Sequence, residues 1–483
     1  MKDLLQLNFD FDKSGNRLME RLQKGNFITL FEVKTPSTSN DFNSSVNFLK
    51  SMDSAVRQIK KIYAGIALLD KTESIDSWNI ANFASGGLSK SNIDNNIIYV
   101  SGKNGEHDDI RNTIKQCSAS GLRNIVPVSG NGYTEELKNK KDKQPCFDTT
   151  HILKIIEGMH ESEVIHPGCV VNPFKYLSID IFPQYFKLVK KINFGAKFII
   201  AQSGWDMMKL QELRWFLDQR ELHFPTIARL TLLTPTLVEE ILEGKHPGIH
   251  ISRDFKMILE KERKYGVQQF ASAQWRRLQL QASGCRLMGY SGIQIAGIER
   301  PEHISTAAER IDQALNEFKD LPTWHNAYMD HISRADMAPF EYRFYLYNNL
   351  LKNNHNYAPE VNSDGIAHCS IWEKFHYKLC RSMFSNDNIL TPEEHLLSKK
   401  LFTGCAKVCS YCRLPMTHYI CPETCPKGLA NGPCGGSRID GRCELNEKQC
   451  IHIKRTKLAC WLNEIDTLEE DYIKHPATVS KIK

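Results

Sequence analysis

The segment FITLFEV at residues 27–33 decides the fold, because it begins a series of short apolar runs. Ile28, Leu30 and Glu32 alternate along it, so they share one face of a β-strand. Seven further runs follow, separated by stretches with helical periodicity. They are IYAGIALL (62–69), NIIYVSG (96–102), NIVPVSG (124–130), VIHPGCVVN (164–172), KFIIAQ (197–202), TIARLTLL (226–233) and GIQIAG (292–297). Eight strand–helix units in roughly 300 residues predict an α/β protein with a TIM (β/α)8 barrel. A doubly wound sheet is disfavoured, because no strand is followed by GxGxxG.

The chain after the eighth run changes composition twice. We expect a barrel over residues 1–320 and a helical connector, rich in aromatic, Asn and His residues, over 321–365. A small cysteine-rich, metal-binding domain is expected over 366–483.

The overall composition is typical of a soluble globular protein, with 41% hydrophobic and 24% charged residues. The first residues, MKDLLQLNFDFDKSGN, include acids and no apolar stretch, so no signal peptide is expected. No segment is long and apolar enough for a membrane span. We therefore expect a cytoplasmic, reduced protein, in which clustered cysteines are metal ligands rather than disulfides.

Eight of the fifteen cysteines are closely spaced near the C-terminal end. They are Cys405, Cys409, Cys412, Cys421, Cys425, Cys434, Cys443 and Cys450. Eight thiolates suit two four-thiolate sites, which could be two [4Fe–4S] clusters, two zinc ions or one of each. The spacing alone does not assign cysteines to sites. The other cysteines before residue 400 are scattered and are expected to be plain thiols.

Two other interpretations of these cysteines are disfavoured. Cys405, Cys409 and Cys412 have the spacing of radical-SAM cluster ligands, but such a loop would follow the first strand of a barrel and here it follows the eighth. A zinc ribbon needs paired CxxC units, and only Cys409 and Cys412 form one.

The cysteine-rich region is also basic, with nine Lys or Arg residues against four acids between residues 405 and 460. These cations could compensate thiolate charge, or they could dock an acidic electron carrier. Nucleic acid is the least favoured partner.

Polar residues end four of the expected strands, at the edge where TIM barrels carry their active sites. They are Glu32, Asn131, Asn172 and Gln202. Glu32 could be a general acid, or it could pair with Lys34 or another lysine at the mouth. The two asparagines and the glutamine could equally be structural caps.

Several segments resemble a known family, methylenetetrahydrofolate reductase, a flavin-dependent TIM barrel. FITLFEVKTP, RNIVPVSGNG and VKKINFGAKFIIAQ are similar to its first strand, its fourth strand with the flavin loop, and its sixth-strand region. CPETCPKGLANGPCGGSRIDGRCEL resembles the C-terminal domain associated with these reductases, which occurs as a separate metal-binding partner subunit or fused to the barrel.

The resemblance implies roles for individual residues. Glu32 matches the general acid that opens the folate imidazolidine ring, and Gln202 matches the glutamine that binds the pterin. Lys191 matches a lysine near the flavin phosphate. Asn131 stands where the family usually has an aspartate near the flavin, and Asn172 where it has a tyrosine.

The implied function is flavin-dependent reduction of 5,10-methylenetetrahydrofolate to 5-methyltetrahydrofolate, with FAD or FMN as the flavin. Electrons would come from NAD(P)H or an electron-donor protein. A [4Fe–4S] cluster in the cysteine-rich domain would relay them to the flavin, whereas zinc there would be structural. Two alternatives remain: a folate-binding methyl-transfer component without flavin, and a non-catalytic electron-transfer adaptor. An oligomer is possible.

Overall fold

The structure is a computed structural model. It describes residues 15–72, 76–103, 105–130, 146–332, 340, 344–351, 359–362, 368–384, 396–405 and 411–479, with 396–399 as backbone only. Asn131 and Cys409, both predicted site residues, lie outside the described residues.

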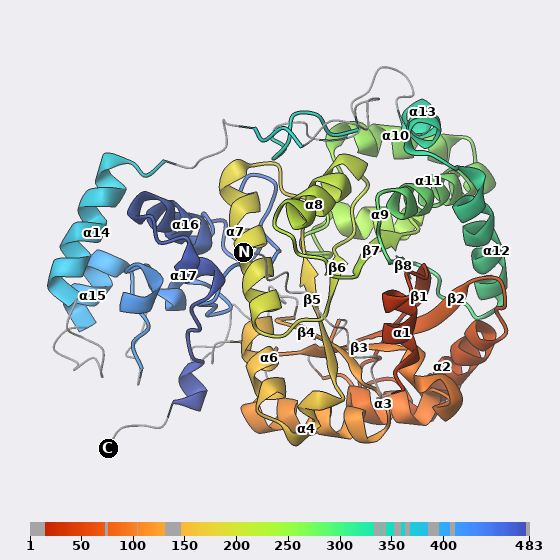
Figure 1. Cartoon of the computed structure of the whole chain (residues 1–483), viewed down its shortest axis with the longest axis horizontal. Coiled ribbons are helices and arrows are strands. Elements are labelled where there is room, and N and C mark those ends of the chain that lie inside the picture. The colour runs from red at the N-terminus through yellow and green to blue at the C-terminus, as the bar shows by residue number, and fades with distance from the viewer. Residues whose placement is uncertain are drawn as a thin grey trace, which may run out of the picture.

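Eight parallel strands close into a barrel in sequence order, because β1 pairs with both β2 and β8 (Figure 1). The strands are β1 (Ile28–Lys34), β2 (Tyr63–Leu69), β3 (Ile97–Ser101), β4 (Asn124–Val128), β5 (His166–Val171), β6 (Phe198–Ala201), β7 (Thr226–Thr231) and β8 (Gly292–Ala296). Each lies within one of the eight predicted apolar runs or extends it by a residue. The predicted TIM barrel is therefore confirmed.

Helices surround the barrel, and their sequences explain their ends. In α2 (Phe42–Arg57), for example, Asp41 caps the N-terminus by accepting a hydrogen bond from the Ser44 N–H. Apolar residues recur every three or four positions on the buried face of this helix. The helices of the barrel are α1 (Arg17–Gln23), α2 (Phe42–Arg57), α3 (Ile80–Gly87), α4 (His107–Ala119), α6 (Thr149–Glu157), α7 (Ser178–Asn193), α8 (Met207–Gln219), α9 (Pro235–Leu242), α10 (Arg253–Lys264), α11 (Val267–Leu287) and α12 (Glu302–Glu317).

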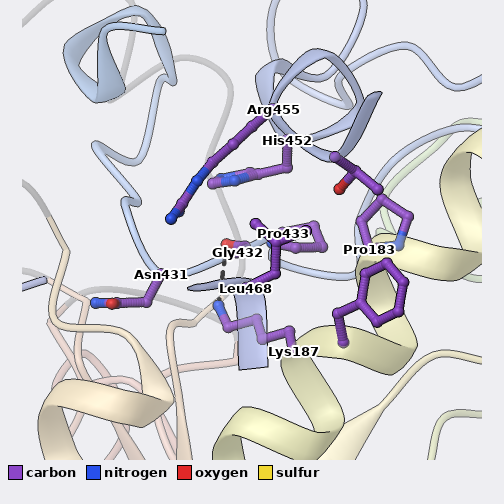
Figure 2. A pocket seen from close by; sticks show the side chains of 10 residues that line it. Pro183, Lys187, Asn431, Gly432, Pro433, His452, Arg455 and Leu468 are labelled. Carbon is purple, nitrogen blue, oxygen red and sulfur yellow. Dashed lines mark hydrogen bonds between the residues drawn. The ribbon is translucent and has the colours of Figure 1, made fainter. Parts of the chain in front are cut away.

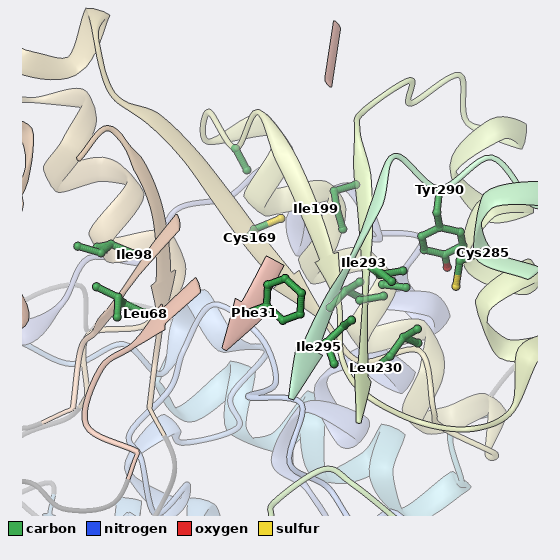
Figure 3. Close-up of a cluster of buried hydrophobic side chains, with 14 of the residues drawn as sticks. Phe31, Leu68, Ile98, Cys169, Ile199, Leu230, Cys285, Tyr290, Ile293 and Ile295 are labelled. Atoms are coloured by element: carbon green, nitrogen blue, oxygen red, sulfur yellow. The ribbon is translucent and has the colours of Figure 1, made fainter. Parts of the chain in front are cut away.

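Strand alternation divides the core into two layers. Outward-facing residues such as Phe31, Ile199 and Ile293 pack under the surrounding helices (Figure 3). Inward-facing residues such as Ile28 and Leu30 fill the barrel together with apolar side chains of α1. Since Glu32 follows Ile28 and Leu30 on the same face, the alternation carries it into the interior at the carboxyl end.

The connector is helical only in part. Helix α13 (Leu321–Ile332) packs against α11 through Trp324, which is fully buried and donates its indole N–H to the Leu280 carbonyl at 2.7 Å. Residues 344–351 and 359–362 instead meet in an antiparallel bridge between Tyr347 and Val361.

The C-terminal region consists of α14 (Ile371–Phe384), α15 (Leu396–Thr403), α16 (Ile451–Leu462), α17 (Asp466–Glu469) and loops between them. Helices α16 and α17 pack against α7 of the barrel, while α14 and α15 form the far edge of the molecule (Figure 1). Among the described residues, no helix combines the length and apolarity that crossing a membrane requires.

Candidate functional site

A buried carboxylate lies at the carboxyl end of β1 inside the barrel. The side chain of Glu32 is only 6% exposed and accepts hydrogen bonds from Arg229 on β7 and Gln294 on β8. Arg229 binds it through two nitrogens, Nη2 at 2.8 Å from Oε2 and Nε to Oε1, and Gln294 Nε2 lies 2.7 Å from Oε1. Such a forked pair fixes the carboxylate in one orientation.

Two more residues extend this group. Arg229 also donates to Gln202 Oε1 at 3.0 Å, and the Tyr99 hydroxyl donates to Gln294 Oε1 at 2.9 Å. Burial, followed by the charge of Glu32, raises the pKa of Tyr99. Burial opposes the charge on Arg229, but the Glu32 carboxylate outweighs it and raises the pKa of the guanidinium. We call Glu32, Tyr99, Gln202, Arg229 and Gln294 the mouth network.

The mouth network brings together two predicted residues, Glu32 and Gln202, and adds three that we did not predict. Glu32 does form an ion pair, but its partner is Arg229 and not the predicted lysine. The sequence could have indicated Arg229, because it lies two residues after the inward-facing Ile227 in TIARLTLL and so shares its face of the strand. Held by a guanidinium, Glu32 can donate a proton only after that pair opens.

A small cavity lies beside the network at the ends of β5 and β6. It measures about 20 Å³, room for one water but not for a pterin ring. Its lining is mainly aromatic: Phe174, Tyr176, Ser203, Gly204, Trp205, His250, Ser252, Phe255 and Phe340. A larger ligand would fit this cavity only by displacing part of its lining.

Asn172, at the end of β5, connects the barrel to the C-terminal region of residues 366–483, which we call the tail. Its Nδ2 donates to the carbonyls of Gly248 at 2.9 Å and Gly435 at 2.8 Å, while its Oδ1 accepts the Phe174 N–H. The neighbouring Lys175 donates to the Ser437 carbonyl. The polar atoms of Asn172 are therefore committed to the protein itself.

Lys191 is likewise enclosed. It is 8% exposed and its ammonium donates to the Val170 carbonyl of β5. Burial, aided by Lys187, lowers its pKa to about 8. Neither Lys191 nor Asn172 is hydrogen-bonded to the mouth network in the described part of the chain, so these two side chains do not fit a flavin site as they stand.

The end of β4 is also covered by the tail. Lys427 donates to the Gly130 carbonyl at 3.1 Å and to Glu444 Oε1 at 2.7 Å, and the Cys146 N–H donates to the Lys427 carbonyl. Burial opposes the charge on Lys427, but Cys434 and Glu444 outweigh it and raise the pKa of the ammonium. The loop of residues 425–437 thus lies across the carboxyl ends of β4 and β5.

A second small cavity, of about 10 Å³, lies between α7 and the tail. Figure 2 shows Lys187 on one side, joined to the Gly432 carbonyl, with His452 and Arg455 of α16 opposite. His452 is 4% exposed, and neither ring nitrogen has a partner within the described chain. Burial lowers its pKa well below the ordinary range, so the imidazole is neutral here.

Four thiols of the tail share one local geometry, and we call Cys425, Cys434, Cys443 and Cys450 the inner thiol set. Each sulfur accepts the backbone N–H two residues later in the chain. For Cys434 the donor is Gly436 at 3.4 Å. The corresponding donors for the other three are Lys427, Leu445 and His452. The charge of Cys434 acts on each of the other three thiols, so the four lie near one another.

Three further predicted ligands form an outer thiol set: Cys405, Cys412 and Cys421 belong to one apolar cluster beneath α14. Cys409, expected to join them, falls on the undescribed part of the chain. Within the described residues, no three His, Cys, Asp or Glu side chains are arranged closely enough to hold a metal ion. The structure therefore groups the thiols without forming a complete coordination shell.

The tail has a recognisable family. Residues 385–477 match the family model described as methylene-tetrahydrofolate reductase C terminal. The resemblance predicted for the cysteine-rich region is thus confirmed. The match ends at the tail and does not extend to the barrel.

Other comparisons are weaker. No curated protein matches the chain. An uncharacterized protein from Clostridium thermocellum, described as binding two copies of 5-methyl-5,6,7,8-tetrahydrofolic acid, is 16% identical with a TM-score of 0.45, over 62% of this chain and 99% of its own. The 7,8-dihydropteroate synthase from Vibrio fischeri is 12% identical with a TM-score of 0.34, over 61% of this chain and 94% of its own. At such scores neither likeness bears on the ligand of this chain.

Proposed function

We propose that the barrel binds a tetrahydrofolate derivative at the mouth network and that the chain acts in folate one-carbon chemistry. The family of residues 385–477 supports this, because its description is that of a folate reductase. The observation that carries the proposal is the partly buried, hydrogen-bonded group of Glu32, Arg229 and Gln202. Its donors and acceptors suit the amide and amine edges of a pterin.

The reaction we propose is reduction of 5,10-methylenetetrahydrofolate to 5-methyltetrahydrofolate. Glu32, after taking up a proton from solvent, donates it to open the imidazolidine ring to an iminium. NAD(P)H then delivers hydride to the iminium carbon, or an electron-carrier protein delivers two electrons while solvent supplies the second proton. The pterin opens the pair by replacing Arg229 on both Gln202 and Glu32, and the carboxylate so freed takes up the proton that it later donates. Arg229 thus keeps Glu32 in position until the substrate is bound.

A flavin is the cofactor that the family resemblance implies for these electrons. Asn172 and Lys191, expected to contact it, are committed to carbonyls of the protein, and Asn131 lies outside the described residues. No step of the reaction is therefore assigned to a flavin.

For the tail, we propose that the inner and outer thiol sets bind [4Fe–4S] clusters, zinc or one of each. The N–H···S hydrogen bonds of the inner set support this, because they favour thiolates, although burial outweighs them and raises the pKa of the Cys425 thiol. Lys427, beside Cys434, offsets part of the negative charge of a four-thiolate site. Cys425→Ser should lose metal measured by elemental analysis, whereas Cys460→Ser, outside both sets, should retain it.

The barrel proposal is tested with Glu32→Gln. We expect it to lower production of 5-methyltetrahydrofolate, with NADH or a reduced viologen as donor, by about 10²-fold or more. Glu262→Gln is a matched control, because Glu262 is a buried glutamate bound by Arg277 and Gln274 outside the barrel mouth. Equal loss in both variants, or none in Glu32→Gln, would exclude Glu32 as the acid.

A second candidate, a folate-binding methyl-transfer component without flavin, is favoured by the committed side chains of Asn172 and Lys191. It predicts that the purified protein lacks flavin absorbance and binds 5-methyltetrahydrofolate, yet forms none from the methylene compound. A non-catalytic adaptor would bind no folate at all. Calorimetric titration with 5-methyltetrahydrofolate separates these outcomes.

A further inference from the structure

The outer edge of the tail exposes large apolar side chains. On α14, Ile371 is 83% exposed, Trp372 80% and Phe375 58%, and on α15 Leu401 is 74% exposed. Helices α14 and α15 lie side by side at the end of the molecule farthest from the barrel (Figure 1). We call the surface formed by Ile371, Trp372, Phe375 and Leu401 the outer face.

Helix α14 is apolar on two sides. Tyr377, Cys380 and Phe384 recur at helical spacing and pack into the tail core. Ile371, Trp372 and Phe375 lie on the opposite side of the same helix. A helix needs only one apolar side to pack on its domain, and a cluster of exposed aromatic residues is typical of an interaction surface.

Cations border the outer face. Lys374, Lys378 and Arg381 recur at i, i+4 and i+7, so they form a stripe along α14 between its buried side and the outer face. The one acid of this helix, Glu373, is engaged by the Ser370 N–H at 2.7 Å and by Lys457 at 3.5 Å. Within α14, three cations against one engaged acid therefore leave this border positively charged, as far as the described residues extend.

We propose that the outer face docks an acidic electron-carrier protein. An apolar centre with a charged rim is the usual composition of a transient protein interface, and Trp372 supplies the kind of side chain that anchors one. The positive stripe selects an acidic partner and speeds its approach. A partner docked there is separated from the outer thiol set by α14 alone, because the buried side of α14 packs against those thiols. That the partner carries electrons rests on the proposed reductive function.

The test uses the full chain immobilised on a sensor surface, with a small acidic [2Fe–2S] ferredoxin as probe and cytochrome c, a basic redox protein, as control. We expect ferredoxin to bind and cytochrome c not to bind. Binding should weaken at least about tenfold between about 50 and 300 mM salt, because exposed charges are screened over that range. Trp372→Ala/Phe375→Ala should weaken it by about tenfold or more. Lys374→Glu/Lys378→Glu should abolish the salt dependence.

Tyr265→Ala/Val267→Ala is the matched control. These two residues lie where α10 ends and α11 begins, on the barrel, and they are 71% and 80% exposed. It should bind ferredoxin like the parent. Absence of ferredoxin binding at low salt, or equal binding by the Trp372 variant, would overturn the proposal. So would a dimer that the Trp372 variant dissociates in sedimentation, because the outer face would then bind a second copy. Binding is read without folate turnover, so failure of the proposed reaction remains distinguishable.

Discussion

The ion pair between Lys427 and Glu444 lies within the tail, and Lys427 also donates to the Gly130 carbonyl of the barrel, so substitution of this lysine tests how firmly the tail is held on the barrel. The two charged atoms lie 2.7 Å apart, and the side chains are 6% and 9% exposed. Lys427→Met leaves the carboxylate buried without its cation and also removes the hydrogen bond to Gly130. Breaking such a buried pair from one side costs about 3–5 kcal/mol.

The double variant Lys427→Met/Glu444→Gln should recover much of this loss, because no charge is then left unpaired. A coupling of about 2 kcal/mol or more between the two changes is expected. Lys245→Met is the control: its ion pair with Glu243 has the same 2.7 Å distance, but the side chains are 63% and 59% exposed. Solvent screens an exposed pair, so its removal should cost far less than that of the buried pair.

Hydrogen exchange of peptides from residues 421–450 provides the assay, because it reports local opening rather than global unfolding. A cost of about 3 kcal/mol corresponds to roughly 10²-fold faster exchange in Lys427→Met. The reasoning is refuted if Lys427→Met exchanges no faster than Lys245→Met, or if the double variant is worse than the sum of the single changes.

Three further predictions concern other parts of the structure. Asn172→Ala removes donors to two carbonyls and should weaken docking of the tail by about 1–3 kcal/mol, seen as faster proteolysis in the loop of residues 425–437. Burial, with the nearby cations Arg455 and Lys190, lowers the pKa of His418 to about 4. Between pH 6.5 and 4 the unfolded state therefore binds more protons than the folded state, and stability falls as the pH falls. His418→Gln should flatten the pH profile of the urea midpoint across that window. A Cβ on Gly102 would lie 1.8 Å from a backbone oxygen, so Gly102→Ala should lower the melting temperature far more than Gly158→Ala, where the nearest atom is 3.7 Å away.

The barrel and the meeting of Glu32 with Gln202 could be predicted because both depend on local patterns. Apolar runs of strand length fix the strands, and parallel strands deliver their last residues to one rim. Arg229 was missed although the same alternation places it inside, because charged residues in strands are more often read as surface residues. Its pairing with Glu32 changes the chemistry expected at the mouth, since the carboxyl is bound before any substrate arrives.

The tail contacts of Asn172 and of the lysines of α7 could not be predicted, because their partners are distant in the sequence. Helices α16 and α17 pack on the face of α7 that points away from the strands, where a barrel helix ordinarily meets solvent. Lys187 and Lys190 are therefore buried as well. Lys190 donates to the carbonyls of Thr467 and Asp471, 277 and 281 residues away in the chain. No periodicity within α7 encodes those partners. The tail supplies both acceptors of Lys190 and one acceptor of Lys187, and a buried amine is tolerable only with such partners, so barrel and tail should fold and act as one unit.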